Sequence, residues 1–370
     1  MLDLEALRSA APPDDPARAL AQLVEAGFDR LPMPGAGQTL QRWRVLAEVA
    51  AIDLSLAKLF EGHTDALAIL HELRAEPPAA RSRWGTWCAE PPDARVSLIH
   101  SHGARLRGRK AWCSGAAAVT HALVSCWDAE GRPCLAAVAM DAPGVTVTDE
   151  DWQAVGMGPS ASVGVHFDDA PAVPVGRPGD YLQRPGFWHG GAGIAACWFG
   201  GALGIARMSR PGAPKANGEA SLRGGAPVLR PDSPNVNAQS PLRESLSIAA
   251  APKSNSIGDP HRLAHLGAIE VSLAGCAAVL REAAAWIDAH PRADAARVAL
   301  RARLVAEESA NAVMQHAGRA VGAGPLCRDR RFARAMADLP VYLRQSHAER
   351  DLAALGRHAV EYEEAAAWML

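Results

Sequence analysis

The spacing of apolar residues changes twice along this chain, and that double change limits the folds open to it. Apolar residues recur at helical intervals between residues 15 and 73. Short apolar runs bounded by Gly, Pro and Asp follow between 121 and 167, and helical spacing returns from Gly186. We therefore expect an α+β protein with an N-terminal α-helical domain over 1–82, a middle antiparallel β-domain over 83–184 and a C-terminal α-helical bundle over 185–370.

The bundle is predicted from two long apolar stripes. They consist of Leu266, Ile269, Leu273, Cys276, Leu280, Ala284 and Ile287, and of Val298, Ala302, Val305, Ser309, Ala312 and His316. Residues 209–258 do not fit, because Pro, Gly, Ser and Asn crowd them and few aliphatic side chains are available for burial. We expect an irregular, dispensable insertion there. The glycines between Gly190 and Gly204 are expected to permit close helix approach.

Composition excludes several classes of function. A net charge of -2 gives no broad basic field, so neither nucleic acid nor an anionic membrane is an expected partner. Seven scattered cysteines without a CxxC pair indicate neither a disulfide framework nor a metal site. The most apolar run, Ile194 to Ala206, is too short to span a bilayer. With no secretory pattern at the start, we expect a cytoplasmic location.

Three neighbouring motifs carry the strongest functional signal. They are Gly-Arg-Lys-Ala-Trp-Cys-Ser-Gly over 108–115, Trp-Gln-Ala-Val-Gly-Met-Gly-Pro-Ser-Ala-Ser over 152–162, and Val-His-Phe-Asp-Asp-Ala-Pro-Ala-Val over 165–173. In content and order they resemble the flavin-contacting middle β-domain of the acyl-CoA dehydrogenase family. The resemblance implies an FAD protein, with Trp112, Cys113 and Ser114 at the cofactor and Ser162 beside the substrate.

The chemistry of these side chains agrees with that resemblance. An isoalloxazine ring needs a flat apolar partner, which Trp112 offers, and a hydrogen-bond donor near N5 and O4, which Ser114 offers. Two residues apart on a strand, both side chains would share one face. The alternative is that Trp112 is a core aromatic residue and Ser114 a turn cap. The segment Trp87, Cys88 and Ala89 resembles the family's C-x-T-E-P motif, although Ala89 replaces the threonine, so contact there would be through the main chain.

A further motif resembles the family's Q-x-x-G-G-x-G. It comprises Gln315, Gly318, Arg319 and Gly322, where small residues would let backbone approach a pyrophosphate and Arg319 would neutralise it. Because the family uses this segment to reach the FAD of a neighbouring subunit, the resemblance implies a homodimer or homotetramer. A plain helix C-cap at Gly318 accounts equally well for the local pattern.

The expected catalytic base is missing. Family dehydrogenases remove an α-proton from an acyl thioester with a glutamate in Y-E-G-T-x-E-I-Q, and the matching position here is Gln345, which cannot accept a proton. His347 and Glu349, a few residues further on, are the alternative bases. Trp188 and His189 are expected to line the acyl pocket or the flavin edge, although a packed Trp and a satisfied His fit as well.

Three interpretations stay open. In the first, the protein oxidises an acyl-CoA thioester at the α,β bond with an atypical base and passes electrons to an acceptor. In the second, it resembles the flavin-dependent monooxygenases that share this fold, which activate oxygen and need no α-proton base. Ser114, His189 and His347 would then stabilise the oxygen-activated flavin. In the third, it is a divergent member without turnover.

Overall fold

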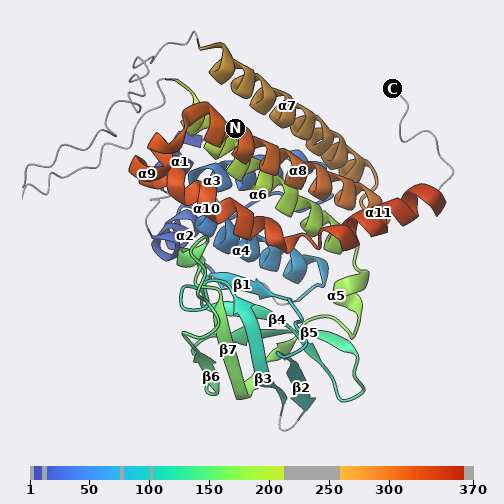
Figure 1. The fold of residues 1–370 in the computed structure, drawn as a ribbon. Helices are drawn as coiled ribbons and strands as arrows, with labels where there is room; N and C mark the ends of the chain where they lie inside the picture. The colour runs from blue at the N-terminus through green and yellow to red at the C-terminus, as the bar shows by residue number, and fades with distance from the viewer. Residues whose placement is uncertain (1–3, 11–14, 76–78, 101–102, 212–258, 362–370) are drawn as a thin grey trace, which may run out of the picture.

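The computed structural model describes the whole chain except residues 1–3, 11–14, 76–78, 101–102, 212–258 and 362–370. A layer of helices covers one end of a curled sheet (Figure 1). The helices are α1 Leu4–Ser9, α2 Pro16–Glu25, α3 Thr39–Ile52, α4 Leu54–Glu72, α5 Asp180–Gln183, α6 Gly186–Ser209, α7 Pro260–Ala289, α8 Ala296–Val321, α9 Ala323–Arg328, α10 Arg330–Tyr342 and α11 Glu349–Glu361, with short 3-10 turns η1 Gly158–Ser160 and η2 Leu343–Gln345.

The segment between residues 38 and 73, where helical spacing is expected, forms two helices, α3 and α4. Asp53 separates α3 from α4 with an extended backbone (φ -158°, ψ 127°). Its side chain accepts a hydrogen bond from the Leu56 N–H at 2.8 Å and so caps α4. A capping aspartate inside an apolar helical pattern is thus the signal that divides the segment.

The strands form one eight-stranded sheet in the order β6-β7-β3-β2-β4-β5-β8, with β1 paired to β4. The prediction of an antiparallel sheet is wrong for two pairings, because β1 runs parallel to β4 along its length and β2 meets β4 at one parallel bridge. Both strands are separated from β4 by intervening chain, which leaves room for a parallel connection. The strands are β1 Trp84–Trp87, β2 Val96–His100, β3 Ala104–Cys113, β4 His121–Trp127, β5 Pro133–Ala139, β6 Val145–Val147, β7 Val163–Pro171 and β8 Val173–Pro174.

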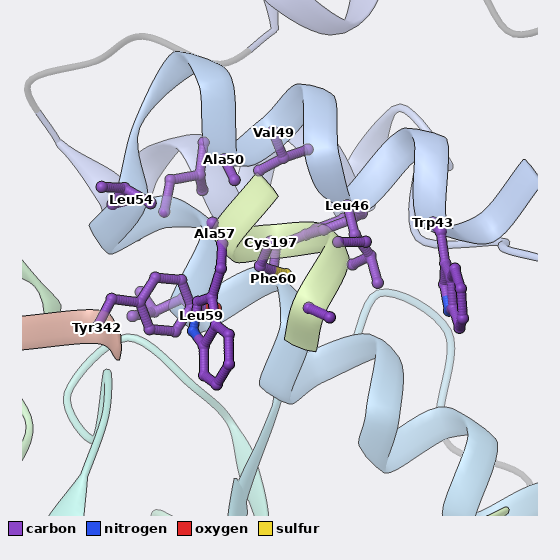
Figure 2. Packing of buried hydrophobic residues seen from close by; sticks show 14 of the residues in the cluster. Trp43, Leu46, Val49, Ala50, Leu54, Ala57, Leu59, Phe60, Cys197 and Tyr342 are labelled. Atoms are coloured by element: carbon purple, nitrogen blue, oxygen red, sulfur yellow. The ribbon is translucent and has the colours of Figure 1, made fainter. Parts of the chain in front are cut away.

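Helix α6 is the centre of the helical layer, between α3, α4 and α8. Figure 2 shows Cys197 of α6 between side chains of α3 and Phe60 of α4. The predicted close approach is confirmed, because a Cβ atom at Gly200 or Gly204 would collide with the backbone of Ala47 or Ala51 in α3. Glycine here lets two helix backbones touch.

The hydrophobic core is continuous from helices to sheet. One cluster contains Leu46 of α3, Phe60 of α4 and Trp198 of α6 together with Leu106 of β3 and Phe167 of β7. Division of the chain into three units at residues 82 and 184 therefore stays a prediction. Of the expected insertion 209–258, residues 212–258 lie outside the described part of the chain.

Helix α7 lies on the outside of the bundle and packs mainly on α8 (Figure 1). Its predicted stripe is buried from Ile269 to Ile287. The opposite face is apolar and exposed, with Val271 at 75% and Leu263 at 47% exposure. By length and composition α6 and α7 could each cross a membrane, which is weak support for a span, and α6 is mostly buried as a core helix.

Candidate functional site

The end of β3 presents a large aromatic side chain to solvent. Trp112 is 53% exposed and has a left-handed backbone (φ 56°), which is rare for a residue with a bulky side chain. The pairing of β3 with β7 shifts register between Lys110 and Cys113 at this point. The expectation that Trp112 and Ser114 share a strand face is therefore wrong, because the irregularity breaks the two-residue alternation and Ser114 follows the strand in a turn.

Hydroxyl groups gather directly behind this turn. The Ser114 hydroxyl lies 2.7 Å from that of Ser162, which lies 2.9 Å from that of Ser160. The Trp87 indole N–H donates to the Ser114 carbonyl at 3.2 Å, and Gly115 N–H donates to the Ser160 carbonyl at 2.8 Å. The structure therefore brings together residues that the sequence assigned to three separate motifs.

A buried lysine of the sheet and its partly exposed carboxylate partner support the same region. The Lys110 ammonium is fully buried and lies 2.6 Å from the Glu90 carboxylate. It also donates to the hydroxyl and carbonyl of Ser125. Glu90 in turn accepts from Ser125 and from the Trp127 indole N–H. Burial by itself raises the pKa of Glu90, but the hydrogen bonds from Lys110, Ser125 and Trp127 outweigh it and hold the pKa below its ordinary value.

The other predicted cofactor contacts of these motifs are Cys113, Cys88 and Ala89. Burial raises the pKa of the Cys113 thiol, which is fully enclosed, so it is not a reactive thiolate. Burial also raises the pKa of Cys88, whose neighbour is the Tyr181 hydroxyl. Ala89 is exposed at the end of the β1 segment. Contact of Cys88, Ala89 and Cys113 with a flavin stays a prediction.

The segment that carries the predicted catalytic residues connects α10 to α11. The Gln345 carbonyl accepts from Arg303 at 2.9 Å, and its side-chain oxygen is buried without a partner among the described residues. His347 is 66% exposed, with its ring Nδ1 3.4 Å from Asp351. Glu349 is exposed in the first turn of α11. Neither alternative base is enclosed.

A buried carboxyl lies nearby on α4. Glu61 is 5% exposed and forms a 2.9 Å ion pair with Lys58. Burial raises the pKa of this carboxyl, and Lys58 opposes the shift. The Cys197 thiol and the Tyr342 hydroxyl lie beside it, and Figure 2 shows both residues in the same packed region.

The structure does not bring Trp188 and His189 to the hydroxyl cluster. Leu59 of α4 contacts Gly115, whereas Glu72 at the other end of α4 accepts from the Gly186 N–H at the start of α6. These contacts are about 20 Å apart along the helix at 1.5 Å per residue. Trp188 is half-buried with its ring edge against Phe187, and burial lowers the pKa of His189.

The expected phosphate segment is helical. Gln315, Gly318 and Arg319 lie within the last turns of α8, and Gly322 ends it with a positive φ. Backbone N–H groups inside α8 are already used in the helix, so those of Gln315 and Gly318 do not form a phosphate cradle in this conformation. The side chains of Gln315 and Arg319 are exposed, and the role of this segment at a flavin stays a prediction.

Sequence reasoning missed three features of this region: the Glu90 partner of Lys110, the Arg303 contact to Gln345, and Glu61. Opposite charges in two neighbouring strand motifs were a usable signal for the first. The other two depend on helix packing between distant segments. No short-range pattern in the sequence marks them.

Comparison with known proteins shows the fold. No protein-family model matches the chain, and no curated protein matches its sequence. Solved structures do match. TdsC from Paenibacillus sp. A11-2, in complex with FMN and indole, superposes with a TM-score of 0.70 at 17% identity over 95% of this chain and 94% of that one. TdsC is described as a dibenzothiophene monooxygenase.

Two further structures agree. Methanesulfinate monooxygenase MsuC from Pseudomonas fluorescens has a TM-score of 0.67 at 20% identity, over 98% of this chain and 97% of that one. KijD3, in complex with FMN and dTDP-3-amino-2,3,6-trideoxy-4-keto-3-methyl-D-glucose, has a TM-score of 0.71 at 19% identity, over 98% and 92%. The expected acyl-CoA dehydrogenase-like fold is confirmed, in the form shared with these proteins.

Proposed function

We propose that the protein is a flavin-dependent monooxygenase that uses reduced FMN and oxygen on a small-molecule substrate. The observation that carries this is the exposed, flat and apolar Trp112 indole at the end of β3, followed two residues later by Ser114, whose hydroxyl pairs with that of Ser162. This arrangement fits the ring of a flavin. Among the similar structures, TdsC and MsuC are described as monooxygenases, and TdsC and KijD3 are complexes with FMN, which supports oxygen chemistry over thioester oxidation.

The catalytic segment favours the same choice. Removal of an α-proton needs an enclosed base, because desolvation gives a carboxylate its basicity. Gln345 has no basic group, and His347 and Glu349 are exposed. A monooxygenase places no such demand on this segment. His347 would therefore act only as a hydrogen-bonding group at the edge of the site, with the Asp351 carboxylate beside its ring.

Bound flavin would supply the oxygen-activating redox chemistry. Trp112 would cover one side of the ring, and the Ser114 and Ser162 hydroxyls would donate hydrogen bonds to its polar edge. Trp87 would hold the Ser114 turn in place through the bond to its carbonyl. FMN is proposed instead of FAD because the similar structures of TdsC and KijD3 contain FMN.

One observation supports acyl-CoA oxidation as a second candidate. Glu61 is an enclosed carboxyl with a raised pKa on the helix whose Leu59 contacts the turn at Gly115, although Glu61 itself faces α6. If the dehydrogenase alternative holds, Glu61 would be its base instead of Gln345, His347 or Glu349. Lys58 weakens this candidate because the ion pair lowers the basicity of the carboxylate.

Anaerobic mixing of flavin-loaded protein with acyl-CoA separates the two functions. A dehydrogenase would transfer hydride from the acyl group to oxidised flavin and bleach it without oxygen. We expect no bleaching, and we expect incorporation of label from ¹⁸O₂ into an accepted aromatic or sulfur-containing substrate in the presence of reduced FMN. Bleaching by acyl-CoA that disappears in Glu61→Gln would reverse the assignment.

We also propose a homodimer in the cytoplasm, with the exposed face of α7 as the contact between copies. The exposed apolar positions on this face include Leu263, Gly267, Val271, Ala274 and Ala278. Such a long uncovered apolar helix face is unusual on a monomer. Small residues would let two α7 helices approach closely.

A further inference from the structure

A cavity of about 610 Å³ lies beside the C-terminal half of α4. Its size falls within the range of about 300–1,000 Å³ that is typical of small-molecule sites. The walls come from α4, from Arg42 of α3 and from the loop between α2 and α3. The lining residues are Asp29, Arg30, Leu31, Met33, Arg42, Thr64, Leu67, Leu70, His71, Arg74 and Ala75.

The cavity is apolar inside and basic at its mouth. Leu31 and Leu70 are buried, with Leu67 partly buried beside them. Arg30 and Arg74 at the mouth are exposed, and within the described residues neither forms an ion pair. An apolar interior with a cationic rim suits a ligand with an apolar body and an anionic end.

The charged groups deeper in the cavity have partners of their own. Arg42 is 97% buried and its guanidinium lies 3.1 Å from Asp65 and 3.4 Å from the Pro32 carbonyl. The Asp29 carboxylate lies 3.3 Å from the ring Nε2 of His63, and its other oxygen is buried without a partner among the described residues, so its negative charge remains in the wall. A ligand carboxylate would therefore be repelled from the Asp29 wall and attracted to the arginines of the rim, which sets the orientation of a bound ligand.

This cavity is distinct from the proposed flavin site. Along α4, Leu59 and His63 face the turn after β3 and the first strand, whereas Glu61 and Asp65 face α6. The cavity-lining Leu67 and Leu70 pack near Trp84 of β1 and Leu123 of β4, further along α4. They lie eight and eleven residues from Leu59, or about 12 and 17 Å at 1.5 Å per residue, so the cavity is displaced from the proposed flavin site along α4.

A fully buried histidine nevertheless connects the two. The Trp84 N–H at the start of β1 donates to His63 Nδ1 at 3.1 Å, so Nε2 carries the proton and donates to Asp29 in the cavity wall. Strand β1 ends at Trp87, which holds the Ser114 turn. The hydrogen bonds from the cavity wall through His63 therefore end at the first residue of the strand whose last residue holds the Ser114 turn.

We propose that this cavity binds a small amphipathic carboxylate, with its apolar body against Leu31, Leu67 and Leu70 and its carboxylate between Arg30 and Arg74. The class includes medium-chain fatty acids and aromatic acids. His71 at the same rim adds a further donor. The site is independent of the proposed monooxygenase function, because none of its residues touches the Trp112 region.

Isothermal titration calorimetry of the full chain with octanoate tests the proposal. We expect one saturable site per chain, and weaker binding of 1-octanol, which lacks the charge, and of acetate, which lacks the body. Arg30→Gln/Arg74→Gln should weaken octanoate binding at least about tenfold, since each charge-assisted contact contributes on the order of 1 kcal/mol. Leu67→Trp, which fills the interior, should abolish it.

A matched variant controls for loss of charge alone. Arg281 and Arg331 are exposed arginines on α7 and α10, and Arg281→Gln/Arg331→Gln should leave octanoate binding unchanged. Thermal melts of each variant show whether it is folded. If Leu67→Trp is unstable, the comparison of Arg30→Gln/Arg74→Gln with Arg281→Gln/Arg331→Gln still tests the proposal. Equal weakening in both double variants, equal affinity for octanol and octanoate, or no saturable binding would each overturn the proposal.

Discussion

At the scale of single residues, Trp112 shows how a local departure from regular structure creates a site. A left-handed backbone at a tryptophan costs on the order of 1–2 kcal/mol, and the surrounding pairing must offset it. The register shift between Lys110 and Cys113 is what turns the indole outward. Sequence motifs identified the residue, but the alternation rule gave the wrong orientation because it assumes an unbroken strand.

Gln345 tests the choice between the two flavin chemistries. In a dehydrogenase of the usual geometry, Gln345→Glu would restore a general base and raise acyl-CoA oxidation by about 10²- to 10⁴-fold. We expect no increase, because the proposed reaction requires no α-proton base. The measurement is acyl-CoA-dependent reduction of an artificial electron acceptor by the flavin-loaded variant. Flavin content is the control, and a rise of two orders of magnitude would refute the monooxygenase assignment.

At the scale of elements, the ion pair between Lys110 of β3 and Glu90, just after β1, connects two of the predicted flavin motifs. We expect Glu90→Gln to lower the free energy of unfolding at pH 7 by about 1–3 kcal/mol, because the buried ammonium loses its charged partner. The folded-state pKa of Glu90 is depressed. Its contribution is therefore complete above the unfolded pKa and is lost as pH falls through the folded value.

The measurement is urea unfolding of wild type and Glu90→Gln at a series of pH values. The difference between them should be largest near neutral pH and shrink below about pH 4.3, the ordinary pKa of glutamate. Glu130→Gln, at an exposed turn, is a matched control. A difference that grows on acidification has the wrong sign for a depressed pKa and would contradict the assigned role.

Helix α7 carries the prediction about assembly. Val271→Asp places a charge at the centre of the proposed contact and should weaken dimerisation at least about tenfold, because an unpaired charge would be buried. Val155→Asp is the control, since Val155 is 92% exposed on a loop of the sheet region. Sedimentation velocity over a concentration series measures the fraction of dimer in the wild type and in both variants. A wild-type monomer at all concentrations, or equal effects of the two changes, would exclude this interface.

At the scale of the whole molecule, the order of helices and strands was predictable because hydrophobic period depends only on local sequence. The stripe from Ile269 to Ile287 and the glycine contacts of α6 followed from the same rule. The parallel pairing of β1 was not predictable, because it is set by how distant segments meet. For the same reason the distance of His189 from Ser114, and the enclosure of Glu61, required the folded structure.

The central claim is that a reduced flavin binds against Trp112. Anaerobic equilibrium titration of purified protein with reduced FMN tests it directly, with Trp112→Ala as the variant and Trp286→Ala, a half-buried tryptophan of α7, as the control. We expect one saturable site per chain, weakened at least about tenfold by Trp112→Ala, since loss of an aromatic stacking partner costs on the order of 1–3 kcal/mol. Undiminished affinity in Trp112→Ala, or no saturable binding in the wild type, would contradict the account.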